Sequence, residues 1–202
     1  SSSQSIAVAV GNVNEAPTIS TSSLSIAEGS TAIGTIAASD PDASSTLSYT
    51  ISGTDSSKFS INASSGAIAF LSPPNFESPT DNGLDNTYNF TVTVSDGSLS
   101  SSQSIAVAVG NVNEAPSFSI ASAQSYVENS GATISVAAND PDASSSLTYT
   151  LSGTDASKFT ISSSGVLSFS SAPDYEAPSD SGSNNIFNDS VAVSDGVNSS
   201  SV

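Results

Sequence analysis

The chain has 202 residues and a formal net charge of −17, with 19 acidic side chains set against two lysines. A surface this negative repels nucleic acids and anionic lipid, so we expect cations as partners and no nucleic acid. Cys and His are both absent, which excludes disulfides, thiolate metal sites and the usual nucleophile and base pairs of enzymes.

Short runs of alternating apolar and polar residues follow one another along the chain, a pattern typical of half-buried strands. In the first half the predicted strands cover residues 24–27, 34–38, 47–51, 59–61, 68–70, 88–94 and 105–109. Turn residues separate the runs, and no helix-length 3.6-residue periodicity is present. An all-β fold with antiparallel Greek-key sandwiches of about seven strands is therefore predicted.

An internal repeat sets the number of domains. Residues 1–17, SSSQSIAVAVGNVNEAP, recur unchanged at residues 100–116, and the segments that follow them also correspond. Two modules of about 100 residues each are predicted, repeat 1 at residues 11–110 and repeat 2 at residues 111–202. Residues 1–10 are interpreted as the last strand of a preceding repeat.

The ends of the chain are out of phase with these modules, because repeat 2 stops where its own last strand is expected to begin. Asp189 also stands where repeat 1 has the inward-facing Phe90, and an unpaired buried carboxylate is costly. We therefore predict that the C-terminal edge of repeat 2 is its least stable part. A neighbouring chain could supply residues 3–10 to complete it.

Acidic and amide side chains gather at the ends of the predicted strands. Asp-Pro-Asp at 40–42 follows the second strand, Asp96 follows the sixth, and residues 12–15 precede the first, so these segments are expected at one pole of the module. Glu28 and Glu77 are expected at the opposite pole. Calcium prefers carboxylate and carbonyl oxygens from several loops, and modules stacked end to end bring opposite poles together.

These motifs carry a family resemblance. The Asn-Val-Asn-Glu-Ala-Pro linkers, the Asp-Pro-Asp and Val-Ser-Asp-Gly loops, Asp-Tyr-Glu at 174–176 and a glutamate near the first strand occur in the order of the calcium motifs of cadherin repeats. The chain resembles bacterial cadherin-like repeats over both modules, which implies a cadherin-like or immunoglobulin-like sandwich. The resemblance also implies Ca²⁺ at the junction, holding the modules as a rod.

The resemblance assigns metal ligands residue by residue. At the junction they are Glu28, Glu77, Asn111, Val112, Asn113, Glu114, Asp140, Asp142 and Asp195. At the entry to repeat 1 they are Asn12, Asn14, Glu15, Asp40, Asp42 and Asp96, which form a half-site. A second half-site is expected at Glu128 and Glu176.

Two further acidic loops receive other interpretations. Asp55 and Asp155 are expected to be solvated turn charges close to Lys58 and Lys158. The loop at residues 81–86, DNGLDN, has the composition of a calcium turn, and whether it binds metal stays open.

These patterns lead us to expect a calcium-dependent structural or adhesive repeat segment of a large bacterial surface or secreted protein, outside the cell and without enzyme activity. The alternative is a carbohydrate-binding or spacer module of a secreted polysaccharide-degrading enzyme, although the absence of Trp argues against strong sugar stacking. The expected partners are calcium ions, together with either the same module in another chain or a surface polysaccharide. No stretch approaches the ~20 apolar residues of a membrane span, so no membrane insertion is expected.

Overall fold

The structure is a computed structural model that describes residues 3–42, 45–142 and 146–202. It divides into two compact units, Ser1–Val112 and Asn113–Val202, which are described one at a time. Residues 1 and 2 of the predicted N-terminal strand lie outside the described part. The residues that follow each Asp-Pro-Asp loop, 43–44 and 143–145, lie outside it as well.

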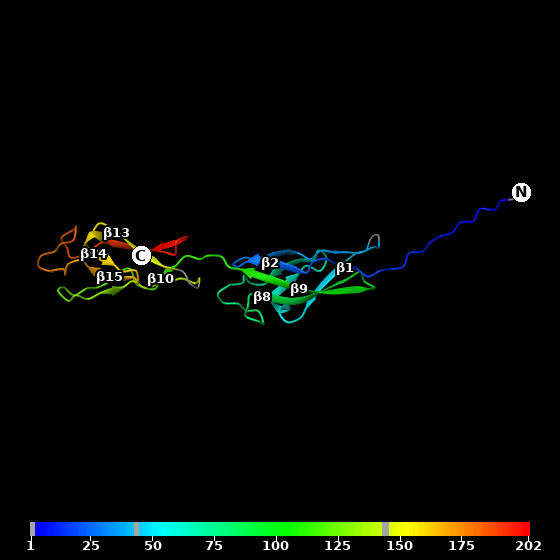
Figure 1. The fold of residues 1–202 in the computed structure, drawn as a ribbon, viewed down its shortest axis with the longest axis horizontal. Helices are drawn as coiled ribbons and strands as arrows, with labels where there is room; N and C mark the ends of the chain where they lie inside the picture. Colours follow the sequence, from blue (N-terminus) through cyan, green and yellow to red (C-terminus); the bar gives the residue numbers. More distant parts are fainter. Residues whose placement is uncertain (1–2, 43–44, 143–145) are drawn as a thin grey trace. The chain divides into compact units, whose positions relative to one another are not determined.

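The first unit is built from two main sheets. The four-stranded sheet has the order β2 (Ser23–Ala27), β9 (Ser100–Gly110), β8 (Thr87–Ser95) and β5 (Ser48–Ser52). The three-stranded sheet has the order β3 (Ala32–Thr35), β7 (Ala67–Phe70) and β6 (Phe59–Ile61). A short pair joins β1 (Thr18–Ile19) to β4 (Ala38–Ser39), and a single 3₁₀ turn, η1 (Ser56–Lys58), leads into β6. The predicted all-β sandwich is confirmed, and Figure 1 shows β2, β9 and β8 next to one another.

One pairing differs from the predicted antiparallel topology. β2 runs parallel to β9, with Leu24 opposite Val107 and Ile26 opposite Val109. The N-terminal segment of the unit is divided between two sheets. Its first part, β1, pairs with β4, and its second part, β2, pairs with β9. A strand that arrives from the other sheet is not constrained by a hairpin, so it can lie parallel to its neighbour.

The core of the first unit lies between the sheets. Alternate residues of β8 and β9 point inward, and Val92, Val94 and Val107 are fully buried. The Phe59 ring packs against Phe70, with centroids 4.4 Å apart. Strict alternation therefore places one face of each strand in the core, as the sequence predicts.

Two buried aspartates correct the sequence-based expectation. Asp55 and Asp155 are 4 % and 2 % exposed, so neither is a solvated turn charge. The Asp55 carboxylate accepts hydrogen bonds from the backbone N–H groups of Asn82, at 2.9 Å, and Asn89, at 2.8 Å. These partners are 27 and 34 residues away along the chain, which is why a local sequence pattern could not find them. Asp55 ties the loop before β8 to the turn before β6.

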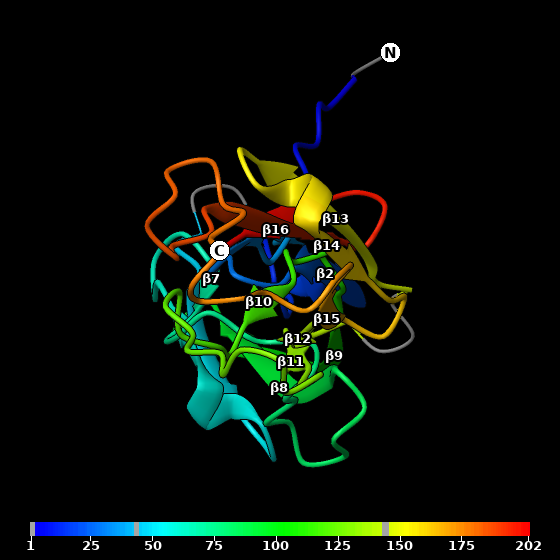
Figure 2. The same ribbon diagram turned by 90° about the vertical axis from the view of Figure 1, so that its left-hand side faces the viewer.

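The second unit repeats this architecture with shorter strands. One sheet has the order β13 (Thr148–Gly153), β16 (Asp189–Ser194) and β17 (Ser199–Ser201), and Figure 2 shows β13 and β16 as neighbours. The other has the order β11 (Ile134–Ser135), β15 (Val166–Phe169) and β14 (Phe159–Ile161). β10 (Ser117–Phe118) pairs with β12 (Ala138–Asn139), and η2 (Ala156–Lys158) precedes β14.

The last strand begins at an equivalent position in both units. β17 begins at Ser199 and β9 begins at Ser100, which are 99 residues apart as in the repeat. The registers agree, because Ala192 pairs with Ser201 as Thr93 pairs with Ser102. In the first unit, β2 pairs with residues 106–110 of β9. Residues 122–127 of the second unit form no strand. The predicted repeat boundaries stay a prediction.

Among the described residues, no helix is long and apolar enough to cross a membrane.

Candidate calcium site

The entry pole of the first unit brings together the six residues predicted there, Asn12, Asn14, Glu15, Asp40, Asp42 and Asp96. The Asp42 carboxylate accepts hydrogen bonds from the Asn12 side-chain amide and from the Glu15 backbone N–H, the latter at 2.8 Å. The Asn14 amide donates to Asp96 Oδ2, also at 2.8 Å. The N-terminal linker is therefore fixed to both acidic loops through their carboxylates.

The second unit reproduces this arrangement with the linker residues that follow β9. Asn113 Nδ2 donates to Asp195 Oδ2 at 2.8 Å, and the Glu114 backbone N–H donates to Asp142 Oδ2 at 2.9 Å. Asn198 Nδ2 also donates to the Asn113 carbonyl oxygen at 2.9 Å. Two independent copies of the motif thus adopt the same geometry.

Turn chemistry explains why the two loops present carboxylates in this way. In each Asp-Pro-Asp loop the first aspartate accepts the N–H of the second, at 2.8 Å for Asp40 and 2.9 Å for Asp140, while the intervening proline restricts φ. In the Ser-Asp-Gly loop, Asp96 Oδ1 accepts the N–H groups of Ser98 and Leu99. In Asp96 and Asp195, Oδ1 accepts the backbone N–H groups of the turn and Oδ2 accepts the side-chain amide of a linker asparagine.

The hydrogen bonds keep several of these carboxylates ionised. Donation by the Asn12 amide and the Glu15 N–H lowers the pKa of Asp42. The Asn113 amide, followed by the Val197 N–H, lowers the pKa of Asp195. Stabilised carboxylates are the charge state that a hard divalent cation requires.

Asp40 and Asp140 each hold one oxygen atom with no hydrogen-bond partner. The Oδ2 atoms of both residues are buried and lack a partner among the described residues. A buried carboxylate oxygen without a donor is unfavourable unless a cation or solvent satisfies it. The donor set around these atoms consists of oxygens and carries negative charge, so it fits Ca²⁺.

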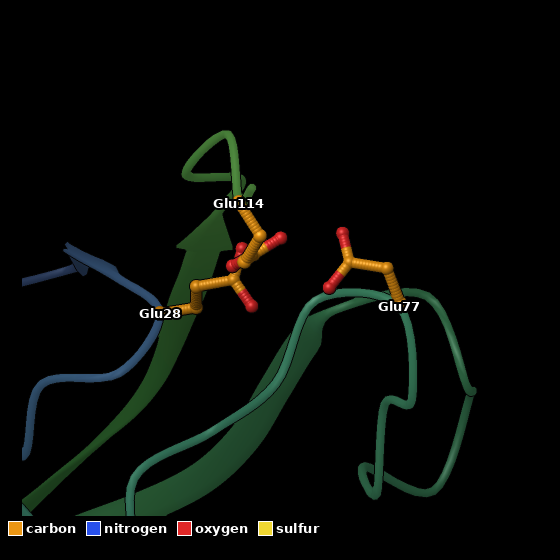
Figure 3. Close-up of side chains that lie close together, drawn as sticks. All are labelled: Glu28, Glu77 and Glu114. Carbon is orange, nitrogen blue, oxygen red and sulfur yellow. The ribbon is translucent and has the colours of Figure 1, made fainter. Parts of the chain in front are cut away.

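Glu28 and Glu77 lie at the opposite pole of the first unit. Glu28 lies at the end of β2, and its carboxylate accepts the Val112 N–H at 2.8 Å and the Phe76 N–H at 2.7 Å. Figure 3 shows the carboxylates of Glu28, Glu77 and Glu114 turned toward one another. One carboxylate oxygen from each lies within 4.8 Å of the others, which is the spacing that a shared metal ion can bridge.

The remaining predicted junction residues contribute differently. Val112 has its backbone N–H bonded to Glu28, and its side chain is partly exposed. The Asn111 side chain is exposed. Only backbone carbonyl or amide oxygens at these two positions offer metal ligands.

A second cluster lies in the other unit, at the pole where the sequence predicts the half-site of Glu128 and Glu176. Asp174 completes this group of three, and Glu128 Oε2 accepts the Tyr175 N–H at 2.6 Å. Asp174 lies in the Asp-Tyr-Glu calcium motif that the sequence shows, although it was not among the predicted ligands. It occupies the position of Asn75 in the first unit, so comparison of the two copies gives the signal for it.

The Asp81 loop has its carboxylate oxygens already engaged. Asp81 is buried and accepts the N–H groups of Asp85 and Asn86, both at 3.1 Å. Burial alone would raise the pKa of Asp81, but these backbone hydrogen bonds hold it below its usual value. The loop is a turn organised by Asp81, because both oxygens of its carboxylate accept backbone N–H groups of the loop.

Comparison with known proteins defines the class of the fold. Residues 22–112 match the family model described as Cadherin domain, which is less than half of the chain. The first unit therefore contains a cadherin-like domain, and the second reproduces its loops and strand order. Among curated proteins, none matches the chain.

Solved structures extend the likeness to both units. They include Drosophila N-cadherin EC1-4, with a TM-score of 0.62 and 21 % identity over 94 % of this chain and 48 % of that one. Human Protocadherin-24 EC1-2 has a TM-score of 0.58 and 22 % identity over 90 % and 86 %. Mouse Cadherin-23 EC22-24 has a TM-score of 0.52 and 24 % identity over 88 % and 58 %. The chain thus spans about half the length of the N-cadherin structure, and the likeness is one of fold.

Proposed function

We propose that this chain is an extracellular structural or adhesive repeat segment in which Ca²⁺ rigidifies the connection between the two modules. The proposed ligands are the junction residues assigned from the sequence, with the entry residues of repeat 1 and the group of Glu128, Asp174 and Glu176 as half-sites. The bacterial origin and the surface or secreted location belong to the same proposal and are supported by the resemblance of the linker and loop motifs.

One observation carries the proposal. Val112 and Asn113 are consecutive residues, and their polar groups are bonded to carboxylates of different units: Val112 N–H to Glu28, and Asn113 Nδ2 to Asp195. A single peptide bond therefore connects residues held by the acidic loops of both units. The covalent chain alone keeps these carboxylates close to the linker, whatever angle the units adopt.

The charge balance favours a divalent cation there. Glu28, Glu77 and Glu114 bring three carboxylates within 4.8 Å of one another, in a chain with only two lysines. Like charges at this separation repel each other, more strongly where burial lowers the effective dielectric constant. When bound, Ca²⁺ would supply the compensating charge, and its oxygen ligands would come from both sides of the linker.

Small-angle X-ray scattering of the chain in Ca²⁺ and in EDTA tests the proposal. We expect a well-defined maximum dimension in Ca²⁺ and a broader distance distribution in EDTA, because the apo linker is free to bend. An identical distance distribution in both buffers would disprove the rigidifying role.

A matched pair of variants separates the proposed site from general charge effects. Asp140→Asn keeps the oxygen that accepts the Asp142 N–H and replaces the buried Oδ2 with an amide NH₂ group, which cannot bind a cation. Asp85→Asn removes the same negative charge from an exposed loop. Isothermal titration calorimetry should show weaker Ca²⁺ binding for Asp140→Asn and nearly unchanged binding for Asp85→Asn. Equal effects of the two substitutions would argue against specific ligation.

The carbohydrate-binding or spacer role stays the alternative prediction. A pull-down with insoluble polysaccharides tests it, and retention of the chain in both Ca²⁺ and EDTA would favour that role.

A further inference from the structure

The loop before β8 contains the single Asn-Gly pair of the sequence, Asn82–Gly83. Both residues are exposed and lie in a turn between β7 and β8. The second unit has a turn at the equivalent position, where the corresponding pair is Ser181–Gly182. The repeat therefore supplies two versions of one loop, which differ at the asparagine.

Matching backbone contacts show that the two loops fold alike. The Asn82 N–H donates to Asp55 Oδ1 at 2.9 Å. In the second unit the Ser181 N–H donates to Asp155 Oδ1 at 2.7 Å. Two later N–H groups of each loop donate to the carboxylate of its first aspartate. Serine takes the place of the asparagine with these contacts unchanged, so the turn does not require the asparagine side chain.

Gly83 has a structural reason to be glycine. A Cβ at this position would lie 3.3 Å from Asp81 Oδ2 and 3.3 Å from the Asp85 carboxylate, which is a close approach. The turn therefore favours the one residue that has no side chain to shield its backbone nitrogen. Because Asn82 precedes it, an exposed side-chain amide lies directly before the least hindered kind of backbone nitrogen.

We propose that Asn82 is a site of spontaneous deamidation, a modification that the second unit cannot undergo at the equivalent position. The Gly83 nitrogen, after losing its proton to solvent, attacks the side-chain carbonyl carbon of Asn82. A new C–N bond forms, the bond from that carbon to the amide nitrogen breaks, and the nitrogen leaves as ammonia. The product is a cyclic succinimide that joins the two residues.

Water then opens the succinimide in one of two ways. Addition at the former side-chain carbonyl restores the normal peptide bond and leaves aspartate at position 82. Addition at the main-chain carbonyl leaves isoaspartate, in which the backbone runs through Cβ and Cγ. The whole sequence consumes one water and releases one ammonia, so it needs no enzyme, oxidant or metal.

Both products disturb a loop that is attached at two points. Each replaces a neutral amide with a carboxylate beside Asp81 and Asp85, and like charges at short range repel each other. Isoaspartate also adds one backbone atom between the Asn82 N–H, which is bonded to Asp55, and the Asp85 N–H, which is bonded to Asp81. The lengthened segment no longer fits between these two attachments, so the first unit should lose part of the stabilisation that Asp55 provides. None of these residues is a proposed calcium ligand, so the reaction does not depend on the calcium proposal.

Peptide mass spectrometry of the whole chain, incubated in neutral buffer with and without urea, is the first test. In the folded chain the peptide that contains Asn82 should gain about one dalton with time, and electron-transfer fragmentation should reveal isoaspartate there. Asn129 is also exposed but is followed by Ser130, so it should react slower by roughly tenfold or more.

Two outcomes of this experiment would overturn the proposal. Conversion of Asn82 in urea but not in the folded chain would show that the native turn prevents the attack. Equal rates at Asn82 and Asn129 in the folded chain would show that Gly83 gives the site no advantage.

Exchanging the residue that distinguishes the two loops provides the matched control. Asn82→Ser gives the first unit the residue that the second unit has, so it should keep the hydrogen bond to Asp55 and abolish the reaction. Ser181→Asn creates an Asn-Gly pair in the second unit, and that loop should then deamidate at a rate similar to that of Asn82. If Ser181→Asn stayed unmodified, the proposed role of this turn would be wrong.

Hydrogen exchange in increasing urea measures the structural consequence. Chains that carry isoaspartate at position 82 should lose protection of the first unit at a urea concentration about 1 M lower than fresh chains, because one hydrogen bond to a buried carboxylate is weakened. The second unit should not change, and neither should the first unit of incubated Asn82→Ser. An unshifted transition in the isoaspartate form would refute the predicted loss of stability.

Discussion

Replacement of Asp55 by alanine is the sharpest test of how the first unit is held together. The Asp55 carboxylate is 4 % exposed and accepts the backbone N–H groups of Asn82 and Asn89. Hydrogen bonds to a charged group contribute about 1.5–3 kcal/mol each, so loss of both should cost about 3–6 kcal/mol. A unit of this size is stable by about 5–15 kcal/mol, so the substitution should bring it close to unfolding.

Hydrogen exchange measured by mass spectrometry in increasing urea provides the assay, because peptides from the two units are resolved separately. Exchange protection throughout the first unit should be lost at a urea concentration about 2 M lower in Asp55→Ala. The second unit, which keeps Asp155, acts as the internal reference. Asp155→Ala should show the reverse pattern, since Asp155 accepts the N–H groups of Ser181 and Asn188 at 2.7 and 3.0 Å.

Asp85→Ala is the matched control. Asp85 lies in the same loop region and accepts the Thr87 N–H at 3.0 Å, but it is exposed. Its loss should cost less than about 1 kcal/mol. If Asp55→Ala and Asp85→Ala shifted the urea transition equally, burial of the Asp55 carboxylate would not be the source of its effect.

Three further predictions follow from individual residues. Burial, followed by repulsion from Asp155, raises the pKa of Asp189. Ionisation of Asp189 therefore destabilises the folded second unit as the pH rises above 3.8. Asp189→Asn should stabilise that unit against urea at pH 7 and not at pH 3. Backbone N–H donors lower the pKa of Asp96, so its stabilising contribution should be lost as the pH falls below 3.8, and Asp96→Ala should abolish that part of the acid dependence of the first unit. Gly66 has φ of +70°, and a Cβ there would lie 2.9 Å from the Tyr49 ring. Gly66→Ala should therefore reduce the free energy of unfolding of the first unit by about 1–3 kcal/mol, which a lower urea midpoint would show.

The local pattern of the sequence determined most of the strands. β8 and β9 alternate strictly between core and surface residues, and this period of two is visible without any structure. The grouping of Asp42 and Asp96 near the N-terminal linker was also predictable, since each follows a strand that ends at the same pole. Turn-forming sequences such as Asp-Pro-Asp fix their own geometry within a few residues.

Contacts between distant residues were decided only by the tertiary structure. The sequence around Asp55 predicts a surface turn residue. Its burial depends on backbone N–H donors that lie 27 and 34 residues away along the chain. The parallel pairing of β2 with β9 depends on the path of the chain between the two sheets, which alternation does not encode.

The repeat shows both sides of this division. Sequence identity between residues 1–11 and β9 established that one segment occurs twice. Only the structure revealed the setting of each copy: Val107 is buried in β9, whereas Val8 is exposed and belongs to no strand. The physical reason is that a strand's stability depends on its neighbours, so identical residues are core in one setting and an unpaired edge in another.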